Sequence, residues 1–266
     1  MKIFEKLFLV MVAGAAFPGL AQASCSAANQ YNFSFATQAA ATLNYANTYS
    51  YTATSTALGN QTFTVNWLTN GLSSTVAGGQ QMPAITGLIT DGVVARNLVV
   101  GGIFTGRTAN VSANARVVVT RFNFVTPIRD FTIQVNDVDF TSNQFRDWLQ
   151  VNGINGASNY NPALSTPFGT NNSVPGPHSN ASSSQLVGAT ATPLSLTVRQ
   201  SGGTGSSANN ATTGTISVTF AQPVTRVEIR YGNYPLTGTE TATGQQAIGI
   251  QSISFCPMPV LSVTKA

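Results

Sequence analysis

The feature that most constrains the fold of this chain is an alternation of apolar and polar residues with a period of two. In the segment TRVEIRYG, Val227, Ile229 and Tyr231 fall on one side of an extended backbone, and the residues between them are charged. Successive side chains of a strand point to opposite faces, so this pattern predicts a strand with one buried face. It recurs in DFTIQVND, LSLTVRQ and TISVTF, and no stretch after residue 23 has a convincing 3.6-residue period.

Further strands are predicted where β-branched and aromatic residues gather between turn residues. They begin at Asn29, Gln61, Arg96, Ala115, Arg146 and Ala247. Short strands in this number predict an all-β fold, an antiparallel β-sandwich of the jelly-roll type. TISVTF and the run that begins at Val224 predict a hairpin, with Pro223 in its turn. Residues 156–192 and 201–213 are rich in Asn, Ser and Gly, and we expect long polar loops there.

The first 23 residues have the composition of a secretory signal peptide. A basic start with Lys2 and Lys6 precedes an apolar run over residues 7–16, and Ala21-Gln22-Ala23 is a small-x-small cleavage site. We therefore expect export, to the cell surface, the extracellular space or the periplasm, and no transmembrane segment in the mature chain. The chain divides into a signal peptide (1–23), a β-sandwich module (24–257), and a linker or the start of a following repeat domain (258–266).

The two cysteines, Cys25 and Cys256, lie at the two ends of this module. In an oxidising compartment such a pair normally closes into a disulfide. The bridge would join both ends of one domain, and chain entropy would favour it by about 5 kcal/mol at most. The alternative is a lipidated Cys25, but residues 22–24 lack the aliphatic residue usually found three positions before a lipidated cysteine.

Charged residues are scarce. After residue 23 the chain has nine arginines and Lys265 against seven acidic residues, a net charge of +3. The arginines are scattered and form no run, whereas nucleic-acid binding normally needs a clustered basic face. We therefore expect no nucleic-acid partner, and solubility that comes from neutral polar groups.

A catalytic set is not evident in the sequence. The single histidine, His178, lies between prolines and glycine in a predicted loop, with no nearby group to orient it as a general base. One histidine and two bridged cysteines do not make a tetrahedral zinc site. We therefore expect that the chain is not an enzyme.

Acidic residues are concentrated in one segment, and Asp137, Asp139 and Asp147 make a candidate calcium site. Asp137 and Asp139 are two apart on a predicted strand, so they would share a face, and Asp147 follows a short polar loop. Calcium takes six to eight oxygen ligands, including carboxylates and amide carbonyls. The alternative is a solvated strand edge on which Asp147 pairs with Arg146 or Arg129. A third interpretation, glycoside hydrolysis by two of these carboxylates, lacks a dry pocket that would raise one pKa.

Aromatic residues are the other candidate for ligand contact, because sugar rings stack on flat aromatic faces. The tyrosines that could serve are Tyr45, Tyr49, Tyr51, Tyr231 and Tyr234, and the sequence leaves open whether they are exposed. Trp67 and Trp148 sit within alternating strands and are predicted to be core residues.

Three segments carry a resemblance: FTIQVNDVDFTSNQFRDWLQVNG, VTFAQPVTRVEIRYGNYP and QAIGIQSISFCPMPVLSVTKA. Together they resemble the N-terminal β-sandwich module of bacterial secreted and cell-surface proteins that carry the prokaryotic "conserved repeat" domain, also called domain of unknown function eleven. In that comparison Pro259 to Lys265 is similar to the first strand of such a repeat.

The sequence as a whole predicts a non-enzymatic, secreted or cell-surface module with a structural or adhesive role in a bacterial envelope protein. Its partner would be a glycan or another surface protein. The alternative is a calcium-assisted, lectin-like carbohydrate-binding module that uses Asp137, Asp139 and Asp147.

Overall fold

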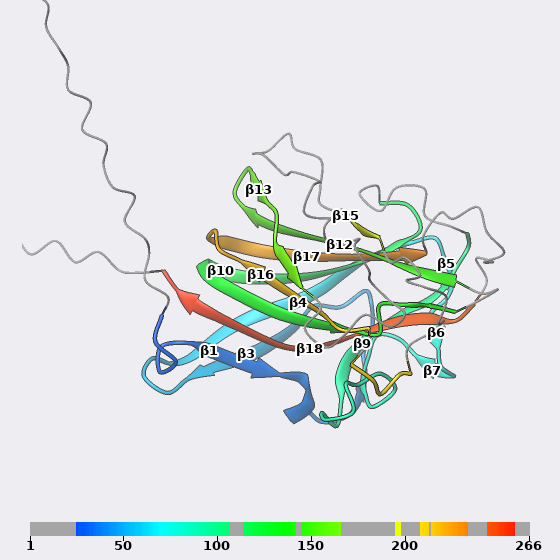
Figure 1. The fold of residues 1–266 in the computed structure, drawn as a ribbon, viewed down its shortest axis with the longest axis horizontal. Coiled ribbons are helices and arrows are strands. Elements are labelled where there is room, and N and C mark those ends of the chain that lie inside the picture. The colour runs from blue at the N-terminus through cyan, green and yellow to red at the C-terminus, as the bar shows by residue number, and fades with distance from the viewer. Residues whose placement is uncertain are drawn as a thin grey trace, which may run out of the picture.

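The computed structural model describes residues 25–106, 114–141, 145–165, 195–197, 208–212, 214–233 and 244–258. Within these ranges the chain is built from antiparallel strands and one short 3₁₀ turn, η1 (Phe35–Thr37), and it contains no α-helix (Figure 1). The structure thus confirms the all-β, antiparallel class. The predicted signal peptide and His178 lie outside the described residues, as do Tyr234 and residues 259–266.

In chain order, the strands are β1 (Tyr31–Ser34), β2 (Ala41–Thr42), β3 (Tyr49–Ser55), β4 (Gly59–Asn70), β5 (Leu72–Ser74), β6 (Val76–Ala77), β7 (Gln80–Gln81), β8 (Ala84–Thr86), β9 (Asn97–Phe104), β10 (Val117–Asn136), β11 (Phe140–Thr141), β12 (Phe145–Asn155), β13 (Ser158–Tyr160), β14 (Ala163–Ser165), β15 (Ser195–Thr197), β16 (Ile216–Phe220), β17 (Val224–Asn233) and β18 (Gln246–Pro257).

Five of these strands close into a ring. β10 pairs with β4, β4 with β3, β3 with β1, β1 with β18, and β18 returns to β10. A closed ring satisfies the backbone of every member on both sides. The architecture at the centre of the molecule is therefore a closed five-stranded barrel, and the predicted jelly-roll sandwich is not confirmed.

β10 is the strand around which the rest is organised. Its first part pairs with β4 on one side and β17 on the other, and its second part pairs with β18 and β16. The register shifts between Asn123 and Ile128 and again after Arg129, and Asp130 has a φ of 51°. Such irregularities bend a strand. Because of this bend, β10 belongs both to the ring and to a second sheet, which we call the lateral sheet. In the lateral sheet β10 pairs with β17, and β17 pairs with β12.

The predicted hairpin of TISVTF and the following run is wrong. β16 and β17 lie one after the other along the same strand, β10, with Phe131 opposite Phe220 and Ile128 opposite Val224. Among the described pairings, β16 and β17 are not partners of each other. Residues 221–223 therefore connect two strands that pair with successive parts of β10. A three-residue connection that contains a proline is compatible with this arrangement and with a hairpin.

The barrel interior is filled by aromatic rings from several strands. Phe33 packs edge-on against Phe63, Phe63 contacts Phe124, and Phe124 contacts Phe131 and Phe255. These rings come from β1, β4, β10 and β18, so side-chain packing joins the same strands that backbone hydrogen bonds join. Trp67 and Trp148 are buried as predicted, with 7% and 8% of their surface exposed.

The first and last parts of the module lie beside each other. β1 runs antiparallel to β18 with Tyr31 opposite Phe255, and the blue and red strands are neighbours in Figure 1. The predicted disulfide between Cys25 and Cys256 is present, across a sequence separation of 231 residues. The covalent bond therefore reinforces a strand pair that is already in register.

Several segments differ from the expectation, among them the short strands β2, β5, β6, β7, β8 and β11, which were not predicted. β3 was not predicted, although it contributes one wall of the ring, and the predicted polar loop from residue 156 begins with two short strands, β13 and β14. Within the described part of the chain, no helix is long and apolar enough to cross a membrane.

Candidate functional site

The three aspartates proposed as a calcium site do not lie as a strand would place them. β10 ends at Asn136, and Asp137 has a φ of 64°, a left-handed conformation that is rare for residues other than glycine. Asp137 and Asp139 therefore lie in the connection from β10 to β11. The interpretation of two carboxylates on one strand face is wrong, because the chain turns at Asp137.

The same three aspartates are buried, with exposed fractions of 9% for Asp137, 4% for Asp139 and none for Asp147. The backbones of Asp139 and Asp147 are joined by a 2.9 Å hydrogen bond from the Asp147 N–H. In addition, the Asp139 N–H donates to Oδ2 of Asp147 at 3.1 Å. The alternative of a solvated strand edge is thus wrong.

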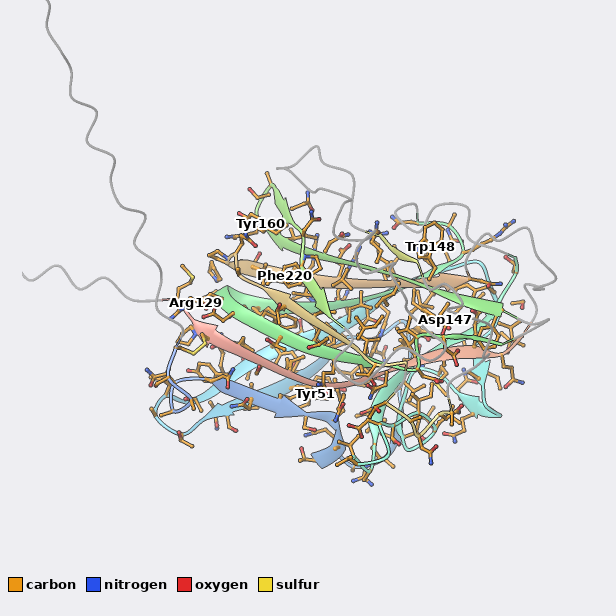
Figure 2. All side chains as sticks on the ribbon, viewed as in Figure 1. Tyr51, Arg129, Asp147, Trp148, Tyr160 and Phe220 are labelled. Atoms are coloured by element: carbon orange, nitrogen blue, oxygen red, sulfur yellow. A yellow bond between two sulfur atoms is a disulfide. The ribbon has the colours of Figure 1, made fainter. Side chains whose placement is uncertain are left out.

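Asp147 does not pair with Arg129, one of the two partners named in that alternative, and the side chain of the other, Arg146, lies outside the described residues. Arg129 forms its ion pair with the neighbouring Asp130 at 2.7 Å. Figure 2 shows Arg129 and Asp147 well apart along the long axis of the molecule. Instead, Oδ1 of Asp147 accepts a 2.6 Å hydrogen bond from the hydroxyl of Tyr231.

Burial raises the pKa of Asp137 and Asp147 well above the ordinary value of 3.8. Repulsion by Asp139 adds to the effect of burial at both positions. The hydrogen bond from Tyr231 acts in the opposite direction on Asp147 but does not cancel the effect. Two carboxyl groups that resist ionisation, next to the carboxyl group of Asp139, form an environment in which a proton or another cation is favoured.

Asp137 also lines a cavity of about 120 Å³ together with Gln246 and Asn209. Gln246 is 1% exposed, and within the described residues neither its amide nitrogen nor its amide oxygen has a hydrogen-bond partner. The same holds for Oδ1 of Asp137. The cavity is therefore lined by polar atoms with unused hydrogen-bonding capacity, which favours a polar occupant.

The described residues contain no group of three or more His, Cys, Asp or Glu side chains placed to hold a metal ion. The aspartates nevertheless affect one another electrostatically. A calcium ion at this place would need oxygen ligands beyond these carboxylates, such as the amide of Gln246 and backbone carbonyls.

The candidate tyrosines are not a stacking platform for sugars. Tyr45, Tyr49 and Tyr51 are partly buried and pack against the core, and Tyr231 is fully buried. The Tyr45 hydroxyl exchanges two 2.8 Å hydrogen bonds with Gly101. Tyr51, labelled in Figure 2, contacts the rings of Phe33 and Phe35. Burial raises the pKa of Tyr51 to about 12.

A feature that the sequence analysis missed is a groove on the outer face of the barrel, with a volume of about 650 Å³. We call it the Ser/Thr groove. Its lining residues are Asn32, Phe33, Ser34, Thr37, Gln38, Thr52, Thr54, Thr132, Ile133, Gln134, Ser252, Ile253 and Ser254. None of them is charged, and the polar ones carry hydroxyl or amide groups.

The register of the strands aligns these side chains across the groove. Thr54 on β3 is opposite Asn32 on β1, Asn32 is opposite Ser254 on β18, and Ser254 is opposite Thr132 on β10. One continuous row of hydroxyl and amide groups thus crosses four strands at the 4.7–4.9 Å spacing typical of a sheet.

Most of this row is available to a ligand. In the described part of the chain, the side chains of Thr54, Thr132, Ser252 and Ser254 make no hydrogen bond to the protein. A signal for the groove was present in the sequence. The outward residues Thr132, Gln134, Ser252 and Ser254 of two predicted strands are neutral, whereas the outward residues of TRVEIRYG are charged.

No protein-family model, curated protein or solved structure matches this chain. The geometry of the chain itself is therefore the basis for a function.

Proposed function

We propose that this chain is an exported, non-enzymatic module of a bacterial envelope protein, with a structural or adhesive role, and that the Ser/Thr groove is its contact surface for a neutral glycan. The observation that carries the proposal is the uncharged row from Thr54 to Thr132. Sugars present closely spaced hydroxyl groups, and a row of side chains that both donate and accept hydrogen bonds is complementary to them.

The rest of the molecule suits such a role. A closed barrel with a disulfide between its two ends holds the groove on a rigid support. The resemblance of three segments to the N-terminal module of conserved-repeat surface proteins supports the same assignment, as does the predicted export signal. The jelly-roll arrangement expected from the number of short strands remains part of the proposal.

The test is retention of the full mature chain in gels that contain a soluble neutral polysaccharide, such as dextran, xylan or a mixed-linkage β-glucan. Ser254→Arg and Thr54→Arg place a bulky charge in the groove. Thr69→Arg adds the same charge at an exposed position of β4 that does not line the groove. We expect at least one polysaccharide to retard the wild type and Thr69→Arg but not the groove variants.

The retardation of each protein is measured relative to its migration in a gel without polysaccharide. Equal retardation of all four proteins in every gel would reject the neutral-glycan assignment. Hydrolysis of a glycan that disappears in Asp137→Ala would reject the non-enzymatic assignment.

A second candidate function is calcium-assisted carbohydrate binding at Asp137, Asp139 and Asp147. The observation in its favour is the burial of three carboxyl groups beside the polar cavity that Asp137 and Gln246 line. It predicts that calcium raises the melting temperature of the wild type and not of Asp137→Asn. Asp130→Asn is the control, since the Asp130 carboxylate pairs with Arg129. Identical melting curves in calcium and in chelator would exclude this candidate.

A further inference from the structure

A cluster of charged side chains lies on the lateral sheet, on the face opposite to that of Asp147. Glu228 on β17 is directly opposite Arg121 on β10. Its Oε1 is 3.0 Å from Nε of Arg121 and 3.3 Å from Nε of Arg226, and its Oε2 is 3.0 Å from Nη2 of Arg230. Three guanidinium groups thus share one carboxylate, and the cluster carries two positive charges in excess.

The chain has too few acidic residues to neutralise this excess. Asp91 accepts a hydrogen bond from Gln251, and Asp130 pairs with Arg129. Asp137, Asp139 and Asp147 form the separate buried group described above. Glu240 is the one acidic residue after residue 23 that lies outside the described ranges. Even with Glu240 beside it, the cluster would remain cationic.

The geometry leaves donor groups of two arginines directed away from Glu228. Glu228 is 3% exposed, whereas the side chains of Arg121 and Arg226 are 27% and 39% exposed. Both arginines approach the carboxylate through Nε. Among the described residues, their terminal Nη groups have no protein partner. A guanidinium has five N–H donors in a planar fork, so each retains donors for a second oxyanion.

The neighbouring side chains hold this arrangement in place. Asn123, opposite Arg226 in the register, donates a 2.9 Å hydrogen bond to Oδ1 of Asn66. Asn66 is in turn opposite Arg121. The two arginines therefore project from adjacent strands whose outward positions are fixed by backbone pairing and by an amide contact. Such preorganisation reduces the entropy that binding would cost.

We propose that Arg121 and Arg226 form an anion-binding site for the carboxylate or sulfate groups of an acidic polysaccharide. Arginine recognises these planar or tetrahedral oxyanions through paired N–H donors. No residue of the cluster lines the Ser/Thr groove, so the site does not depend on the proposed binding of a neutral glycan. The cluster has a net charge of +2 on a small area, which is complementary to the widely spaced negative charges of an acidic glycan. The dense phosphates of nucleic acid would require a longer row of basic residues.

The experiment compares the full mature wild-type chain with Arg121→Gln, Arg226→Gln and the control Arg96→Gln. Arg96 donates its Nε hydrogen bond to the carbonyl of Gln38 and is not part of the cluster, so all three variants lose one charge but only two lose the site. The probes are alginate for carboxylate, dextran sulfate for sulfate, uncharged dextran, and a short DNA duplex, measured by isothermal titration calorimetry at low salt.

We expect alginate or dextran sulfate to bind the wild type and Arg96→Gln equally. Either cluster variant should weaken binding about tenfold, the effect of losing one charge-assisted hydrogen bond. Equal weakening by Arg96→Gln would show that net charge alone is responsible and would overturn the proposal. Equally tight binding of the DNA duplex, lost in the same variants, would overturn the assignment to a glycan, and so would the absence of binding to both acidic polysaccharides.

A second measurement guards against a variant that folds poorly. At constant ionic strength, replacing chloride by sulfate should raise the melting temperature of the wild type more than that of Arg121→Gln. General salting effects are common to both proteins and cancel in this difference. An identical shift in the two proteins would also contradict the site.

Discussion

The hydroxyl of Tyr231 donates a 2.6 Å hydrogen bond to Oδ1 of Asp147 at a place where neither side chain has any exposed surface. Tyr231→Phe removes this donor and leaves a buried carboxyl oxygen without it. We expect the free energy of unfolding to fall by about 1.5–3 kcal/mol, measured by urea denaturation. Tyr49→Phe is the control, because the Tyr49 hydroxyl bonds to an exposed backbone N–H, that of Asn44. Equal losses in both variants would contradict a special role for the buried pair.

The buried aspartates predict that stability depends on pH. The pKa of Asp137 and of Asp147 is raised by burial and by Asp139. The folded state therefore holds protons that the unfolded state releases above the ordinary value of 3.8. Their contribution to stability is complete below that value and is lost as the pH rises through the raised folded-state pKa.

Asp137→Asn removes one of these groups, so the decline in unfolding free energy with rising pH should be smaller in the variant than in the wild type. The difference can reach about 1.4 kcal/mol for each pH unit within the window. Urea denaturation at a series of pH values measures it, with Asp130→Asn as the control. A pH profile of Asp137→Asn parallel to that of the wild type would contradict the prediction.

The disulfide between Cys25 and Cys256 encloses nearly the whole described chain. Because it restricts the unfolded state, its reduction should lower the free energy of unfolding by about 3–5 kcal/mol. The measurement is denaturant unfolding with and without reductant. A double variant, Cys25→Ser with Cys256→Ser, should match the reduced wild type and be insensitive to reductant. Free thiols on the native protein would refute this prediction.

Gly101 on β9 is paired with Ala247 on β18. A Cβ built at this position would overlap the backbone oxygen of Gln246 and come within 2.6 Å of the Ala247 Cα. Backbone atoms in a paired strand cannot rotate away, so Gly101→Ala should cost about 3 kcal/mol or more, seen as a lower melting temperature. Gly79→Ala meets no atom within 4 Å and loses stability only through its positive φ, about 1 kcal/mol. Similar losses would contradict the steric argument.

Much of the strand content could be predicted from the sequence, because period-two alternation marks any strand with one buried face. β3 was missed for a physical reason: its inward positions are two tyrosines, Ala53 and Ser55, so its apolar side is weak. The closure of the ring could not be predicted, since pairing between distant strands leaves no mark in the local pattern. Nor could the connection between β16 and β17 be distinguished from a hairpin.

The candidate site was found in the sequence by the concentration of aspartates, but its geometry was not. The left-handed backbone at Asp137 depends on tertiary packing, as does the contact between Asp147 and Tyr231, which are 84 positions apart. The Ser/Thr groove was missed although the outward residues of two strands lack charge, because a serine or threonine on a single strand looks like an ordinary solvated position. Only the register reveals that residues from four strands stand in one row.

β18 has a consequence for how the protein is made. It is the neighbour of β1, β9 and β10, yet it is the last strand in the described chain. While the ribosome is still adding residues, the strands already synthesised lack the partner that completes the ring, and contacts between such distant positions form slowly. The nascent polypeptide therefore cannot close the ring until β18 has been synthesised, and the strands made before it stay incompletely folded up to that point.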